Sequence, residues 1–136
     1  MLWLLISILA LDLTTVKTEP NLEKRSELAL DYANVELDQV REASNSGDME
    51  KLETALHQVD ESVELAYHAL DDSGKDARNS KFFKQAEMRT RELVRRLEGI
   101  KATASVEDMS LLEKVRDRVA DIHDDLLKRI MSKRKK

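Results

Sequence analysis

Two histidines and three glutamates lie in one stretch of the chain at spacings that suit a divalent cation. Glu53 and His57, His57 and Glu61, and Glu64 and His68 are each four residues apart. In a helix such pairs share one side, where two side chains can meet one ion. The two histidines are about 16 Å apart along a helix, so one ion cannot bind both. The pattern predicts a weak metal site at most, and solvated side chains are the simpler interpretation.

The third histidine, His123, interrupts the apolar side of the last predicted helix, one heptad after Arg116. Glu36 and Arg25 interrupt the apolar side of the first predicted helix in the same way. Such residues favour a half-buried polar layer that fixes the register of packed helices. The alternative is a small ligand-binding or pH-responsive site around His123.

Residue types that would support catalysis are missing or isolated. The chain has no cysteine, which excludes disulfides, thiolate zinc sites and cysteine nucleophiles. It has no Glu-x-x-His motif of the kind found in carboxylate-bridged metal bundles, no glycine-rich phosphate loop and no nucleophile with a neighbouring base. We therefore expect a protein that is not an enzyme and has no cofactor.

Helix-breaking residues divide the chain into four segments of similar length. Pro20 suits a first helical turn, and the stretches ending at Gly47 and Gly74 are stop signals. Asp48 and Ser105 are expected N-caps. The predicted helices cover residues 20–46, 48–72, 77–103 and 106–131.

The apolar residues of the last three segments recur at alternating spacings of three and four, which is typical of coiled-coil-like seams. Gly99 costs about 1 kcal/mol relative to alanine in a helix interior, so an end of the third helix at Gly99 is the alternative to an end at residue 103. Short connections make consecutive helices antiparallel. The sequence thus predicts an all-α, antiparallel up-down-up-down four-helix bundle over residues 18–132.

Residues 1–17 form a hydrophobic leader, since Met1 to Leu11 is almost wholly apolar. Its length suits a secretory signal peptide better than a membrane span, which needs about 20 residues. No Lys or Arg precedes it, and Thr14 to Val16 is an indifferent cleavage region. We expect export to a periplasm or extracellular space. The alternatives are a leader packed on the bundle and a membrane anchor.

Charge is unevenly distributed along a chain whose net charge is −4. Residues 48–72 hold eight acidic residues and one basic one, whereas residues 75–101 hold nine basic and four acidic. As predicted neighbours, these two helices would attract each other through ion pairs. The alternative is that a basic ridge on the third helix forms a partner-binding face, comprising Arg78, Arg89 and Arg96.

The basic tail, residues 133–136, could contact phosphates, but it is short and lacks aromatic residues for stacking on bases. We expect no nucleic-acid binding, and membrane contact only if the leader stays uncleaved. These observations favour a non-enzymatic exported bundle acting through protein–protein contacts or self-association. One alternative is a membrane-associated or cytoplasmic helical adaptor that uses the leader and the tail. Another is a bundle that binds divalent cations weakly.

Overall fold

A computed structural model describes residues 13–132, and this part of the chain is all-helical, with five helices packed against one another and no strand. The leader residues 1–12 and the basic tail 133–136 lie outside the described residues. The helices are α2 (Leu13–Lys17), α3 (Leu22–Ser46), α4 (Met49–Asp72), α5 (Lys81–Ala102) and α6 (Val106–Met131).

Each of the four long helices begins at a polar N-cap. Asn21, Asp48, Ser80 and Ser105 each accept a hydrogen bond from the backbone N–H three residues further on, which satisfies a donor that the first helical turn leaves unpaired. Asp48 and Ser105 are the caps that the sequence predicted. Pro20 precedes the first helix instead of lying in it, because Asn21 is the cap.

The third long helix, α5, begins later than predicted and ends within one residue of the predicted residue 103. It begins at Lys81 instead of residue 77, because Asp76 accepts hydrogen bonds from the backbone and side chain of Arg78 and forms a local turn. It continues through Gly99 to Ala102. The buried residues Leu97 and Ile100 flank Gly99, and their burial offsets the conformational cost of the glycine.

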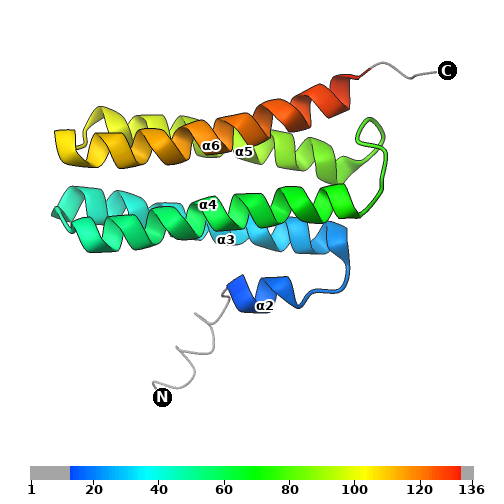
Figure 1. Cartoon of the computed structure of the whole chain (residues 1–136), viewed down its shortest axis with the longest axis horizontal. Helices are drawn as coiled ribbons and strands as arrows, with labels where there is room; N and C mark the ends of the chain where they lie inside the picture. The colour runs from blue at the N-terminus through cyan, green and yellow to red at the C-terminus, as the bar shows by residue number, and fades with distance from the viewer. Residues whose placement is uncertain (1–12, 133–136) are drawn as a thin grey trace.

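Two antiparallel hairpins make up the body of the molecule (Figure 1). The first consists of α3 and α4, joined at Gly47, whose φ of 74° is left-handed and favours glycine. The second consists of α5 and α6. The hairpins lie one above the other in Figure 1, with α5 beside α3 and α6 beside α4.

Neighbouring helices from different hairpins run parallel. Among residues 13–132, the ion pairs between the hairpins share one separation of 58 positions, which only parallel helices allow: Arg89–Asp31, Arg96–Asp38, Arg118–Asp60 and Arg129–Asp71. The two helices within each hairpin are antiparallel, whereas α3 with α5 and α4 with α6 are parallel.

The prediction of which helix packs beside the basic segment was wrong. The sequence placed residues 75–101 beside residues 48–72, but α5 lies mainly against α3 and α6, with slight contact to α4. The turns inside the hairpins are short and hold consecutive helices side by side. Residues 73–80 form a longer connection, which carries the chain across the end of the molecule from α4 to α5 (Figure 1).

The core lies between the hairpins and is built from the predicted apolar seams. Its largest fully buried side chains include Leu37, Leu52, Leu70, Phe83, Leu97, Leu112 and Leu126. Thr90 is buried among them, and its hydroxyl donates to the backbone oxygen of Ala86 in its own helix.

The short helix α2 packs against α3 and α4, on the side away from the second hairpin (Figure 1). Leu13 and Val16 are buried there, and Val16 is 0% exposed. Lys17 forms an ion pair of 3.1 Å with Glu61 of α4. None of the helices among residues 13–132 combines the length and the apolar character that crossing a bilayer requires.

Candidate functional site

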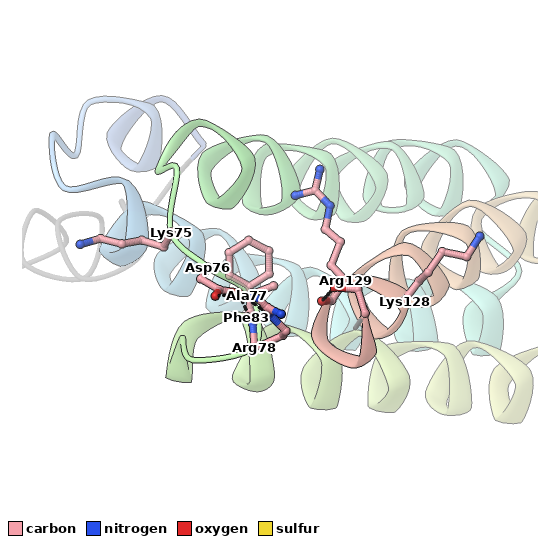
Figure 2. Close-up of a pocket in the computed structure, with 8 residues that line it drawn as sticks. Lys75, Asp76, Ala77, Arg78, Phe83, Lys128 and Arg129 are labelled. Carbon is pink, nitrogen blue, oxygen red and sulfur yellow. Dashed lines mark hydrogen bonds and ion pairs between the residues drawn. The ribbon is translucent and has the colours of Figure 1, made fainter. Parts of the chain in front are cut away.

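A cleft of about 450 Å³ opens at the end of the molecule where the α4–α5 connection meets the last turns of α6 (Figure 2). Ala77 and Phe83 provide its apolar surface, and both are buried. The other lining residues are polar or charged: Lys75, Asp76, Arg78, Lys128, Arg129 and Ser132.

Arg78 holds the connection in place and also lines the cleft. Its Nε donates to Asp76 Oδ1 at 3.0 Å and its Nη2 donates to Oδ2 at 2.9 Å. This bidentate pairing is the strong geometry for an arginine and a carboxylate. The hydrogen bond to Asp76 raises the pKa of Arg78. Asp76 neutralises much of its charge within the cleft.

Arg129 reaches from α6 toward α4 (Figure 2). It donates to Asp71 at 2.7 Å and lies over the Tyr67 ring, with its guanidinium carbon 5.4 Å from the ring centre. Tyr67 in turn donates a hydrogen bond to Asp125. Burial, and next the hydrogen bond to Asp125, raise the pKa of Tyr67. This cluster fixes the end of α6 against α4, and Arg129 is its member that lines the cleft.

Lys75 and Lys128 are the two cations of the cleft without a carboxylate partner among the described residues, and both are exposed. Figure 2 shows them extending away from one another on opposite sides of the cleft. Ser132, the residue before the basic tail, also lines it. Arg78 and Arg129 pair with Asp76 and Asp71, so the two lysines leave the cleft with a positive potential. Its chemistry suits the binding of an anionic group.

Of the three arginines predicted to form one ridge, only Arg78 lies at the cleft. Arg89 pairs with Asp31 of α3. Arg96 donates to Asn34 and Asp38 of the same helix, at 2.5 and 2.6 Å. The last two arginines therefore join the hairpins and present no common free surface with Arg78.

Arg116 and His123 lie together on α6, but Glu36 is not with them. His123 Nε2 lies 2.8 Å from Glu87 Oε2, and Arg116 donates to Glu98 Oε1 at 3.1 Å. Both partners belong to α5, whereas Glu36 lines a groove between α3 and α4. Arg25, the other suggested partner, donates to the Glu19 carbonyl oxygen.

The acidic side of α4 does not assemble a metal site. His57 Nε2 is 3.5 Å from Glu61 Oε2, but Lys17 also binds Glu61. His68 stacks edge-on against Tyr67. Across residues 13–132, no group of three or more potential ligands is close enough to hold a metal ion, and Glu53 and Glu64 join no such group.

Sequence reasoning missed Lys75, Lys128 and Arg129 as members of one site. The available signal was the density of basic residues at the end of the last helix, where Lys128 and Arg129 lie in the final turn of α6. Bringing Lys75 to them required knowing how the α4–α5 connection crosses the end of the molecule. Comparisons with protein-family models, curated proteins and solved structures found no match.

Proposed function

We propose that the protein is a non-enzymatic, exported four-helix-bundle protein that acts through contacts with other proteins. The observation that carries this proposal is the unpaired positive charge at the cleft. Each arginine of α5 and α6 pairs with a carboxylate: Arg89, Arg91, Arg95, Arg96, Arg116, Arg118 and Arg129. Lys75 and Lys128 lack such partners and flank a concave surface.

The finer description as a four-helix bundle is supported by the packing of α3 to α6. Each of these helices packs mainly against one neighbour in its own hairpin and one in the other hairpin. The buried residues of all four converge on one core. A rigid body of this kind suits a binding protein, because surfaces on rigid elements lose little conformational entropy on binding.

Export is supported by the apolar run Met1 to Leu11. The position of Val16 limits where a signal peptidase would cut. Removing residues 1–17 would take this fully buried side chain out of the folded protein. We therefore place the cleavage before Leu13, so that α2 remains in the mature chain.

Two measurements on the native host test the proposal. Intact mass of the protein from soluble exported, membrane and cytoplasmic fractions should give an exported species that has lost at most residues 1–12. Chemical cross-linking in intact cells should give a heteromeric product that depends on the folded protein, with a heat-unfolded sample as the control. A full-length protein in the cytoplasm, or no cross-linked product at all, would contradict it.

A second candidate, a membrane-associated adaptor, draws on one observation. α2 is packed on the hairpin of α3 and α4, so an uncleaved leader would join the folded body through an ordered helix. The same mass measurement separates the two candidates. The full-length mass in the membrane fraction would favour the adaptor.

A further inference from the structure

We infer that the cleft at the α4–α5 connection binds an acidic peptide segment of a partner protein, with carboxylates of that segment meeting Lys75 and Lys128. This inference rests on the proposed function, since it names the surface and the chemistry of the protein contact. If the cleft does not bind such a segment, the proposed function can still hold.

The shape and the charges of the cleft fit an extended segment. Lys75 and Lys128 point away from each other across the cleft (Figure 2), so one compact anion would not meet both amines. A segment lying across the cleft could present one carboxylate to each amine. Between them lie Ala77 and Phe83, whose side chains are almost wholly buried (Figure 2).

The internal ion pairs direct the partner's charges to the two lysines. Asp76 already pairs with the guanidinium of Arg78, and Asp71 pairs with that of Arg129. An incoming carboxylate would have to displace a formed pair at either arginine, whereas an exposed lysine gives up only water. Exposed charges attract weakly over distance in salt, so binding is expected to depend strongly on ionic strength.

The sequence carries further positive charge beyond the described residues. Ser132 lines the cleft, and residues 133–136 follow it with four more positive charges. Nearby positive charge raises the association rate of an acidic partner and steers its approach.

The test is fluorescence anisotropy of the full-length protein with a labelled twelve-residue peptide that contains six Glu, one central Leu and otherwise Gly and Ser. The cleft variant is Lys75→Glu with Lys128→Glu. The control variant is Arg41→Glu with Lys114→Glu. Arg41 and Lys114 are exposed, have no ion pair among the described residues and lie away from the cleft, and the control alters net charge equally.

We expect the wild-type protein to bind the peptide and the cleft variant to bind it at least tenfold more weakly, with the control within threefold of wild type. No binding by the wild type, or equal weakening in both variants, would overturn the inference. Circular dichroism checks that both variants fold. Stronger competition by inorganic phosphate, or by vesicles containing phosphatidylglycerol, than by unlabelled peptide would also overturn it. Cross-links to a partner that map to a different surface of the protein would also overturn the inference, but they would leave the proposed function intact.

Discussion

Arg116 and Arg118 lie two positions apart on α6 and bind to different neighbours. Arg118 donates to Asp60 of α4, and Arg116 donates to Glu98 of α5. Residues two apart in a helix are rotated by about 160° from one another, so the two arginines point to nearly opposite sides. Arg118 joins the hairpins, and Arg116 lies on the side of α6 that faces away from α4.

Removing the arginine that joins the hairpins should destabilise the fold. The side chain of Asp60 is 11% exposed, and its Oδ1 has no hydrogen-bond partner. Arg118→Ala would leave a buried carboxylate unpaired, at a cost of about 1–3 kcal/mol. Urea unfolding monitored by circular dichroism measures this. Arg95→Ala is the control and should cost less than about 0.5 kcal/mol, because Arg95 and Glu92 are both exposed. Equal losses for both variants would contradict the assignment.

Glu87 should make the fold sensitive to acid. Burial alone would raise the pKa of its carboxyl, but hydrogen bonds from His123 and Arg91 outweigh burial and lower the pKa below its ordinary value of 4.5. A lowered folded pKa contributes stability above pH 4.5, which is lost as the pH falls through the folded value. Glu87→Gln should therefore be less stable than wild type at pH 7, with a smaller difference at pH 3. Unfolding at the two pH values measures both, and an unchanged difference would refute the prediction.

Glu36 should have the opposite effect on stability, because its charged form should destabilise the fold at neutral pH. Burial raises the pKa of its carboxyl, and the hydrogen bond from Tyr32 only partly opposes this. A raised folded pKa contributes stability at low pH, which is lost as the pH rises through the folded value. Glu36→Gln should equal or exceed wild-type stability at pH 7 and show no advantage at pH 3. The exposed Glu53→Gln variant controls for the loss of one negative charge. Marked destabilisation at pH 7 would show that the charged form of Glu36 supports the fold.

Val16 should contribute to stability although it precedes the predicted start of the bundle. Its side chain is 0% exposed in contact with the core. Val16→Ala should cost about 1–3 kcal/mol, because the substitution leaves a cavity between α2 and the first hairpin. Thr14→Ala, at an exposed position of the same helix, should change stability by less than about 0.5 kcal/mol. Thermal unfolding of both variants decides whether α2 is part of the folded unit, and equal melting temperatures would show that it is not.

The sequence predicted the long helices well because their signals are local. Caps such as Asp48 and Ser105 and the apolar seams depend only on residues close in the chain. The start of α5 was misplaced because Asp76 forms its own turn with Arg78. Residue type alone does not decide whether a side chain forms such a turn or the backbone begins a helix.

The arrangement of the helices was less predictable, because it depends on how one connection crosses the molecule. Arg116 and His123 were expected to meet Glu36 in a polar layer. They pair with Glu98 and Glu87 of α5 instead, because α3 and α6 are not neighbours among the described helices. Periodicity identified which residues interrupt an apolar side, but the parallel placement of the hairpins determines which side faces a neighbour.

The parallel placement of the hairpins also determines where a further hairpin could be added to the bundle. Two hairpins related by a sideways shift form the start of a row, as in modular arrays, where every added unit packs on the outer side of the one before. On the second hairpin that outer side carries the pairs Glu87–His123 and Glu98–Arg116. On the first hairpin the corresponding outer side is covered by α2. A third hairpin would therefore have to displace α2 on one side or cover these charged pairs on the other.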